Sequence, residues 1–339
     1  MKKILIFGSG SIGNHMSFAS RKLGFKVYIT DININALLRM KNEIYPKRYK
    51  KWDKNIKLIN FNKVFLLKEM FDLVIIGTPP NSHIELFNKC LKKINFKNIL
   101  IEKPLTTFKK NWVKKNFSNQ KVNIFCGYNH SISKSFLYFL NNLKIFKKNK
   151  SILVNWKEGW KGILNAHFWM KNEFSSYLGN LNDGGGSLHE HSHGLHLLNI
   201  ILKRFKIDLD NIEFSSNILL KKKGKKKYDE YSCLIGRNKQ TFFKYETDLI
   251  TIPADKSVFI TDNKSKSIKL VFNYKKDTDA VIIAYNTNKK IKLFKKTRSS
   301  EFENELKYII NLKKKDYSKS NINIFTALNV MKIIKRILK

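Results

Sequence analysis

Histidines and a carboxylate gather in one short segment of the sequence, GGGSLHEHSHGLH, which ends at His196. Four of the chain's eight histidines lie in its last eight residues, and Glu190 stands three positions before His193. A helix that begins at Ser187 would carry His189, His193 and His196 on one face. A carboxylate beside a histidine fixes its tautomer and stabilises the imidazolium, so this segment is suited to acid–base chemistry.

Two other interpretations of this segment stay open. Ser187 and Glu190 have the spacing of a capping box, in which the carboxylate only satisfies the start of a helix. His189 and His193 have the spacing of a zinc pair, but no suitable cysteine and no His-Glu-x-x-His pattern accompanies them. We therefore expect no metal, and we take His193 as the candidate base with His196 as the alternative.

A second candidate is the pair Glu102-Lys103, followed by Pro104, at the end of the apolar run NILI. A lysine at the end of a central parallel strand can hydrogen-bond a substrate oxygen and stabilise the negative charge that develops on it. Alternatively, Lys103 is one of many lysines and Pro104 merely ends a strand. Composition alone favours this alternative, whereas the position at a strand end supports a functional pair.

The N-terminal sequence MKKILIFGSGSIG runs an apolar strand directly into Gly8, Gly10 and Gly13. In a strand–turn–helix unit, the first glycine allows the turn, the second lets a pyrophosphate approach the backbone, and the third lets the helix pack closely. Asp31 closes the next apolar run, where an acidic residue binds the adenosine ribose. The pattern predicts a site that prefers NAD, because the charge of Asp31 repels the 2′-phosphate of NADP. The alternative is an ordinary corner with Asp31 as a helix cap.

The elements that must position these residues alternate between strand and helix in the first third of the chain. Predicted strands lie near residues 4–7, 26–31, 56–59, 72–77, 98–104 and 122–130, and predicted helices near residues 12–23, 35–42 and 81–90. Repeated units of this kind predict an α/β fold with a doubly wound parallel Rossmann sheet. Ligands of such sheets bind at the carboxyl ends of the strands, where the motifs fall.

Beyond about residue 128, strands follow one another without intervening helices. Predicted strands lie at residues 151–159, 211–220, 231–236, 241–247, 257–261, 267–272 and 280–285, and predicted helices at residues 133–143, 301–312 and 322–338. This order predicts a C-terminal α/β domain with an open, mainly antiparallel sheet. We expect residues 1–127 to form the dinucleotide-binding domain and residues 128–339 the substrate and oligomerisation domain.

The composition limits the partners of the chain. Its 339 residues are 42% hydrophobic, which suits two globular domains. The formal net charge of +40 comes almost wholly from lysines spread along the chain, and only seven residues are arginine, the preferred residue for reading bases. We therefore expect no nucleic-acid partner, and the run KKKGKKK is predicted to be a solvated hairpin turn. Three scattered cysteines and the lack of a leader or a membrane span predict a cytoplasmic protein with no membrane partner.

Taken together, the motifs resemble the Gfo/Idh/MocA oxidoreductases. The GSGSIG loop, Asp31, GTPPNSH, EKP, GYNH and the glycine-led histidine segment occur in the order and spacing of that family, and the resemblance reaches FENELKYI near the C-terminus. It implies a Rossmann domain that binds NAD or NADP. It also implies a second domain that holds the substrate and forms a homo-oligomer through its sheet.

The resemblance implies roles for individual residues. It makes Lys103 and His193 catalytic, with Glu190 as the acid near the histidine. It assigns cofactor binding to the glycine loop and to the strand ends that follow it, at Gly8, Gly10, Ser11, Ile12, Gly13, Asp31, Thr78, Pro79, His83 and Glu102. Family members often carry an aspartate where Glu190 stands and a histidine one residue beyond His193.

We expect an NAD(P)-dependent oxidoreductase that transfers a hydride between its cofactor and a sugar or sugar-nucleotide hydroxyl or carbonyl, in surface-polysaccharide metabolism. NAD is the expected cofactor, and NADP is less favoured. Two alternatives are a non-catalytic NAD-binding regulator of the same fold and a reductase of an imine or other non-sugar substrate. Aromatic residues are candidates either for stacking on a sugar ring or for core packing, namely Trp156, Trp160, Phe168, Trp169 and Tyr177.

Overall fold

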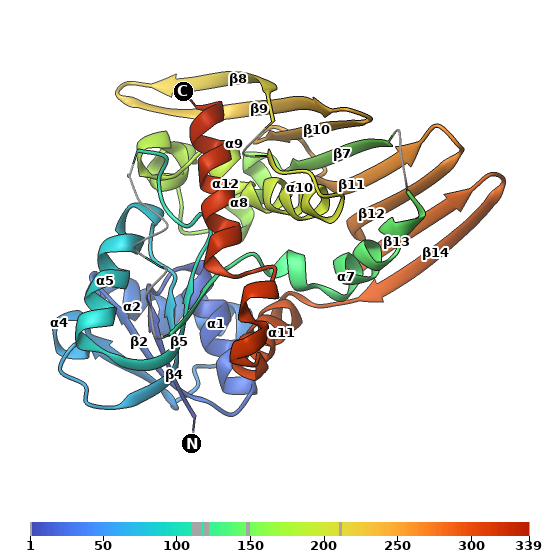
Figure 1. The fold of residues 1–339 in the computed structure, drawn as a ribbon. Coiled ribbons are helices and arrows are strands. Elements are labelled where there is room, and N and C mark those ends of the chain that lie inside the picture. Colours follow the sequence, from blue (N-terminus) through green and yellow to red (C-terminus); the bar gives the residue numbers. More distant parts are fainter. Residues whose placement is uncertain (1, 110–116, 118–121, 147–149, 210–211, 339) are drawn as a thin grey trace. The chain divides into compact units, whose positions relative to one another are not determined.

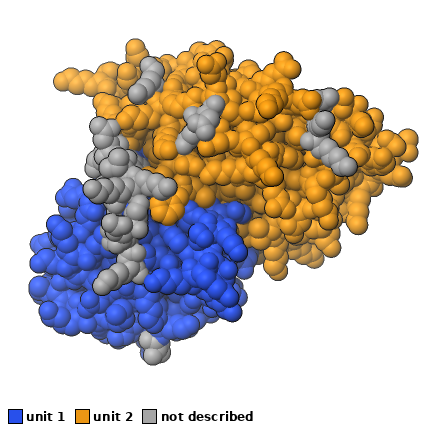
Figure 2. Space-filling model, viewed as in Figure 1, with its two compact units in different colours: residues 1–106, 112–129, 298–324 blue, residues 107–111, 130–297, 325–339 orange. Residues whose placement is uncertain are grey.

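The computed structural model describes residues 2–109, 117, 122–146, 150–209 and 212–338 (Figure 1). The chain divides into two compact units, which are coloured separately in Figure 2. Unit 1 comprises residues 1–106, 112–129 and 298–324, and unit 2 comprises residues 107–111, 130–297 and 325–339. The expected functional assignment of residues 1–127 and 128–339 stays a prediction.

Unit 1 contains a parallel six-stranded sheet. Its strands are β1 (Lys3–Phe7), β2 (Lys26–Asp31), β3 (Ile56–Asn60), β4 (Met70–Ile76), β5 (Asn95–Ile101) and β6 (Asn123–Cys126). They lie in the order β3-β2-β1-β4-β5-β6, which is the strand order of a Rossmann fold. The apolar runs of β1 and β4 are fully buried, as expected for central parallel strands. The predicted doubly wound parallel sheet is confirmed.

The helices of unit 1 connect and flank these strands. They are α1 (Ser11–Lys22), α2 (Ile34–Arg39), the π-helical turn η1 (Met40–Ile44), α3 (Tyr45–Tyr49), α4 (Phe61–Val64), η2 (Pro80–Ser82), α5 (His83–Lys93), α11 (Arg298–Asn311) and η9 (Lys314–Lys319). Helix α11 packs against α1, and Lys22 of α1 forms an ion pair with Glu303 of α11 at 2.9 Å. Residues almost 300 positions apart in the sequence thus share one unit.

Unit 2 contains an eight-stranded sheet. Its strands are β7 (Lys150–Lys157), β8 (Phe214–Lys223), β9 (Lys226–Asn238), β10 (Thr241–Asp248), β11 (Asp255–Asp262), β12 (Lys266–Lys275), β13 (Thr278–Tyr285) and β14 (Asn288–Lys295). Their order is β14-β13-β12-β11-β7-β10-β9-β8, and every pair except β7–β10 is antiparallel. The prediction of a mainly antiparallel sheet is confirmed. The predicted lysine-rich turn joins β8 to β9, while residue 211 of the predicted strand 211–220 lies outside the described residues.

The helices of unit 2 lie on one face of this sheet, which we call the inner face. They are η3 (Asn129–Ile132), α7 (Lys134–Asn141), η4 (Leu143–Ile145), α8 (Trp160–Ala166), η5 (Glu173–Ser175), η6 (Tyr177–Gly179), η7 (Leu181–Asp183), α9 (Ser187–Glu190), α10 (Ser192–Arg204) and α12 (Ile324–Ile337). Side chains of β7 alternate accordingly, since Ile152, Val154 and Trp156 are buried on the inner face. Helix α10 packs on the central strands β7 and β10 (Figure 1).

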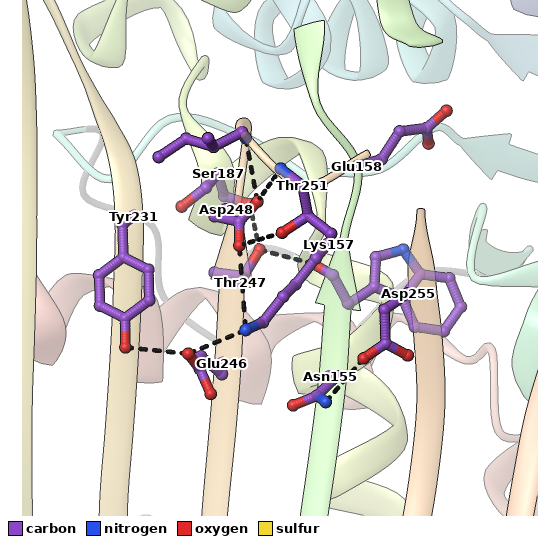
Figure 3. Close-up of polar contacts among 12 residues, drawn as sticks. Asn155, Lys157, Glu158, Ser187, Tyr231, Glu246, Thr247, Asp248, Thr251 and Asp255 are labelled. Atoms are coloured by element: carbon purple, nitrogen blue, oxygen red, sulfur yellow. Dashed lines mark hydrogen bonds and ion pairs between the residues drawn. The ribbon is translucent and has the colours of Figure 1, made fainter. Parts of the chain in front are cut away.

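The opposite, outer face of the sheet carries paired charges. Figure 3 shows Glu246 of β10 between Tyr231 of β9 and Lys157 of β7, at 3.1 and 2.8 Å. Burial raises the pKa of Glu246, but hydrogen bonds from Lys157 and Lys244 outweigh it and lower the pKa to about 2. The carboxylate therefore stays ionised and its charge is balanced by the two lysines. None of the helices in the described ranges combines the length and apolar character that a membrane span requires.

Candidate functional site

The predicted motifs of unit 1 meet along the carboxyl edge of its sheet. Backbone amides beyond the strand ends continue the pairing of the strands, from Gly8 to Thr30 at 2.8 Å, from Gly77 to Phe7 at 2.8 Å, from Glu102 to Ile76 at 2.9 Å and from Gly127 to Ile101 at 2.9 Å. The glycine loop, the Thr-Pro-Pro turn and the Glu-Lys-Pro segment are therefore neighbours. This is the edge at which Rossmann sheets bind their ligands.

The three glycines of the loop are required for different reasons. Gly8 has a φ of +97°, and a Cβ there would lie 2.6 Å from the carbonyl oxygen of Gly77. A Cβ on Gly13 would lie 1.9 Å from the carbonyl oxygen of Gly8. Gly10 has an ordinary φ of −72°, and a Cβ there would meet no atom within 4 Å. Its missing side chain leaves an open cradle, as the approach of a pyrophosphate requires.

Asp31, the predicted partner of the adenosine ribose, also braces the glycine loop. Its Oδ2 accepts hydrogen bonds from the amide and the hydroxyl of Ser9, both at 2.8 Å. Its Oδ1 accepts one from the amide of Asn33 at 2.9 Å. The carboxylate is only partly buried, so its remaining lone pairs can reach a ligand.

The first turn of α1 holds the predicted cofactor-binding residues Ser11 and Ile12. Ile12 packs against Gly77, since a Cβ on Gly77 would lie 3.3 Å from Cγ2 of Ile12. The guanidinium of Arg48 donates to the backbone oxygen of Ser11 at 3.3 Å and to its hydroxyl at 3.1 Å. Burial lowers the pKa of Arg48. Sequence reasoning did not single out Arg48, which places a cation beside the loop and comes from a segment without a recognisable motif.

The turn after β4 contains the predicted residues Thr78, Pro79 and His83. The hydroxyl of Ser82 lies 2.7 Å from that of Thr78 and donates to the carbonyl of Pro79 at 2.8 Å. The ring of His83 is fully buried, with its nitrogens 2.7 Å from the carbonyl of Thr78 and 3.2 Å from that of Leu105. His83 thus links this turn to the segment that follows Lys103.

Glu102 and Lys103 follow β5 directly. The Glu102 carboxylate packs on Gly127, where a Cβ would lie 2.6 Å from Oε2, and it accepts a hydrogen bond from the Lys103 amide at 3.3 Å. Burial and the charge of Glu102 raise the pKa of Glu305, on α11, well above its ordinary value. The raised pKa favours the uncharged form of Glu305, so that two neighbouring carboxyl groups do not both carry a negative charge.

In unit 2, the glycine-led histidine segment is anchored by Asp229 of β9, which is fully buried. Its Oδ2 accepts from the Ser187 hydroxyl at 2.6 Å, from the Leu188 amide at 2.8 Å and from the Ser232 hydroxyl at 3.0 Å. A Cβ on Gly186, whose φ is +91°, would lie 1.9 Å from Oδ1. Asp229 therefore caps the start of α9 from a neighbouring strand, a role that the sequence did not reveal.

One expectation and one alternative interpretation for this segment are wrong. The expected single helix from Ser187 is interrupted at His191, because the Tyr245 hydroxyl donates to the His191 carbonyl at 2.9 Å and α10 begins anew at Ser192. The capping box is also wrong, since the helix cap is Gly186 and the Ser187 hydroxyl is bound to Asp229. Tertiary partners have replaced the local ones.

The three histidines of the expected stripe have different surroundings. His189 is fully buried with Nδ1 3.0 Å from the Gly185 carbonyl, and burial lowers its pKa to about 4, so it stays neutral. His196 is buried with Nε2 3.2 Å from the Thr326 hydroxyl. His193 is partly exposed and packs against the rings of His130 and Trp156. Of the three, His193 is the one with access to solvent.

Glu190 is the last residue of α9 and lies near a second carboxylate, Glu158. Burial raises the pKa of Glu158, but its ion pair with Lys256 at 2.5 Å outweighs this and lowers the pKa, while the charge of Glu190 acts in the opposite direction. His191, also nearby, has Nε2 3.3 Å from the Glu158 carbonyl. The acid–base groups of unit 2 thus surround the junction of α9 and α10. Within the described ranges, no group of three or more His, Cys, Asp or Glu side chains is arranged to hold a metal ion.

Most of the aromatic candidates for sugar stacking belong to packed clusters. Trp160 and Tyr177 pack on a buried cluster around Tyr228, whose hydroxyl accepts a hydrogen bond from the Trp160 indole at 3.0 Å. Phe168 and Trp169 contact each other edge to face. Trp156 is buried beside His193. This packing accounts for Trp156, Trp160 and Tyr177 without a ligand, whereas Phe168 is exposed.

Residues 2–118 match GFO_IDH_MocA, an oxidoreductase family with an NAD-binding Rossmann fold. This match over the N-terminal part of the chain confirms the resemblance drawn from its motifs. A search of curated proteins by sequence finds no match to this chain.

Solved structures resemble the whole chain. Levoglucosan dehydrogenase in complex with NADH and levoglucosan is 14% identical, with a TM-score of 0.72 over 99% of this chain and 96% of that one. A mutant of KijD10, a 3-ketoreductase from Actinomadura kijaniata, in complex with TDP-benzene and NADP, is 10% identical, with a TM-score of 0.70 over 98% and 94%. The WlbA dehydrogenase from Bordetella pertussis, in complex with NADH and UDP-GlcNAcA, is 13% identical, with a TM-score of 0.68 over 100% and 96%. The two-unit fold is therefore that of these proteins.

Proposed function

We propose that this protein is an NAD(P)-dependent oxidoreductase that transfers a hydride between its cofactor and a sugar or sugar-nucleotide hydroxyl or carbonyl. The observation that carries the proposal is the open cradle at Gly10. No contact within the chain requires a glycine at this position. The family match over residues 2–118 agrees with it. The substrate class is supported by structural neighbours that were solved with levoglucosan and with UDP-GlcNAcA.

NAD is the favoured cofactor in this proposal. The pyrophosphate would lie on the amides of the first turn of α1, at Ser11 and Ile12, with Arg48 adding positive charge beside Ser11. Asp31 would accept hydrogen bonds from the adenosine ribose and would disfavour a 2′-phosphate. Thr78, Pro79 and Glu102 would line the remaining strand ends, and His83 would act by fixing the turn.

The proposed chemistry assigns one task to each of three side chains. The cofactor, when bound, accepts or supplies the hydride. During oxidation, His193 would take the proton of the substrate hydroxyl and become an imidazolium, which Glu190 would stabilise. Lys103 would hydrogen-bond the same oxygen and stabilise its developing negative charge. During reduction, His193 would return the proton.

The cofactor assignment is tested by titrating the protein with NADH and NADPH at moderate salt. We expect saturable NADH binding that Gly10→Ala weakens by tenfold or more, because the new methyl group fills the cradle. The folded state should gain about 0.4–1 kcal/mol or stay unchanged, since the site accepts a Cβ without strain. In contrast, Gly13→Ala should lower the free energy of unfolding by about 1–3 kcal/mol or more through overpacking. Wild-type affinity in Gly10→Ala would refute the cradle.

The catalytic assignment is tested with Lys103→Ala and His193→Ala. Each variant should lower kcat by about a hundredfold or more with a sugar-nucleotide substrate while NADH binding persists. Turnover at the wild-type rate in both variants would show that the assigned residues are wrong. Cofactor binding without turnover of any sugar would favour a regulator or a reductase of a non-sugar substrate.

The proposal also includes a homo-oligomer in the cytoplasm. The outer face of the unit 2 sheet carries partly exposed apolar side chains around balanced charges, which suits a self-association surface. All three cysteines are buried and free, as is usual in a reducing compartment.

A further inference from the structure

Four rings meet on the inner face of the unit 2 sheet, and one of them belongs to His130, the last residue of the GYNH motif, to which the motifs assigned no role. They are His130 of η3, Trp156 of β7, His193 of α10 and Phe272 of β12. We call this group the ring cluster. Because its members come from four elements that are far apart in the sequence, the fold, and not local sequence, brings the two histidines together.

His130 lies at the centre of the ring cluster. Its ring centroid is 4.7 Å from that of His193, with the two planes at 87°. It is also 5.0 Å from the Trp156 ring and 5.2 Å from the Phe272 ring. Trp156 and Phe272 are 2% and 4% exposed, so apolar surfaces rather than water fill much of the space beside the two imidazoles.

The charged groups that face the cluster form ion pairs. Lys256 of β11 lies 5.9 Å from the Trp156 ring and binds Glu158. Lys296, beyond β14, lies 5.7 Å from the Phe272 ring and binds Asp279 of β13 at 2.9 Å. From α9 and the junction, Glu190 and His191 face Glu158. Since the two lysines have carboxylate partners, they add little net charge at the two imidazoles of the cluster.

We propose that His130 is a positioning residue for His193, and that the two imidazoles titrate as a coupled pair that holds one proton at most near neutral pH. Two cations at this separation beside apolar rings repel each other strongly. A proton on His130 therefore lowers the proton affinity of His193, and the packed ring fixes its orientation. The proposal rests on the proposed function, in which His193 must be neutral to accept a proton from the substrate hydroxyl.

The test is a pH titration of the full-length protein with 15N-labelled histidine, followed by NMR, with the His193 signal assigned by its loss in His193→Ala. In the wild type, we expect His193 to titrate with two steps, as coupled groups do. In His130→Phe, which keeps a ring but cannot be protonated, we expect one step whose midpoint is higher by half a pH unit or more. The pH profile of kcat/KM should move in the same direction by the same amount.

His167→Phe is the matched control, because it removes an imidazole at the end of α8, where His167 binds the Ile163 carbonyl outside the ring cluster. It should leave the His193 titration unchanged. An unchanged His193 titration in a folded His130→Phe overturns the proposal, and His130→Gln provides the same test if the phenylalanine variant does not fold. A shifted titration without cofactor-dependent turnover would support the coupled pair and refute the proposed function. Cofactor-dependent turnover with an unchanged His193 titration would support the proposed function and refute the coupled pair.

Discussion

The carboxylate of Asp31 has one role in the structure and a second in the proposed function. One oxygen holds the glycine loop through the amide and hydroxyl of Ser9, and we propose that the group also binds the adenosine ribose. The negative charge, and not the hydrogen-bond acceptor, is what would disfavour a 2′-phosphate. The two tasks can be separated, because asparagine keeps an acceptor oxygen but carries no charge.

Asp31→Asn is therefore expected to raise the affinity for NADPH relative to NADH by about tenfold, which corresponds to about 1.4 kcal/mol. Fluorescence titration with both cofactors measures the ratio. Asp72→Asn is the control, because it makes the same charge change near the amino end of β4, where the carboxylate binds Lys97 and the Lys3 amide. An unchanged ratio in Asp31→Asn would mean that this charge does not select the cofactor.

Single residues of the site were predictable where the backbone itself demands them. Gly8 and Gly13 are required by contacts inside the strand–turn–helix unit, and their spacing revealed the turn. Arg48 and Asp229 could not be predicted, since each acts on a segment far away in the sequence and neither belongs to a local pattern. A local motif shows which residues a turn requires, but it does not show which side chain from a distant part of the sequence binds that turn.

At the level of elements, the short helix α9 depends on a carboxyl group that folding places in an apolar environment. Burial raises the pKa of Asp229 to about 6, from an ordinary value of 3.8. A group whose pKa is raised by folding stabilises the folded state fully below its unfolded pKa, and this contribution is lost as pH rises through the folded value. The start of α9 is therefore a pH-sensitive part of unit 2.

Asp229→Asn should remove this dependence while keeping an oxygen that accepts from Ser187 and Leu188. Between pH 4.5 and 7.5, the wild type should lose about 2 kcal/mol of unfolding free energy that the variant retains. The folded pKa lies roughly 1.5 pH units above the starting pH, and each unit corresponds to about 1.4 kcal/mol. Denaturant unfolding at the two pH values measures the difference between the proteins. Parallel pH dependence in both would indicate that Asp229 does not titrate in this range.

Helices and strands could be predicted from the sequence where apolar residues recur with a regular period. They were harder to predict where a tertiary hydrogen bond sets a helix boundary or where lysines interrupt the apolar pattern. The central strands β1 and β4 of unit 1 follow apolar runs, and the predicted positions of all six strands agree with the structure within a few residues. The break at His191 depends on the Tyr245 hydroxyl, which is 54 positions away. Strand β14 was not predicted, because four lysines interrupt its apolar residues, as is common for an edge strand.

At the level of the whole molecule, the outer face of the unit 2 sheet is a mixed surface. One row of paired residues crosses it from β9 to β14 and consists of Ile235, Lys244, Leu153, Phe259, Lys269, Ile282 and Ile291. Five of the seven are apolar, and none of the seven is fully buried. A surface of this kind gains free energy when a second copy covers it.

Phe259→Glu should therefore shift the protein toward a smaller assembly, because it places a charge in the middle of this row. Sedimentation velocity at several protein concentrations measures the mass, and thermal unfolding checks that the variant is folded. Leu66→Glu, which makes the same kind of change at an exposed site in unit 1, should leave the mass unchanged. A wild-type protein that sediments as a monomer at all concentrations would contradict the proposed homo-oligomer.

The interruption at His191 separates the anchor of the histidine segment from the part that presents its side chains. Asp229 holds α9, and the Tyr245 hydroxyl holds the junction, whereas α10 starts afresh at Ser192. Gain or loss of one residue at the junction would turn α10 by about 100° without loosening its anchor. An insertion or deletion at the junction of α9 and α10 could thus change which side chain of α10 faces a substrate, while the fold on either side of the junction stays the same.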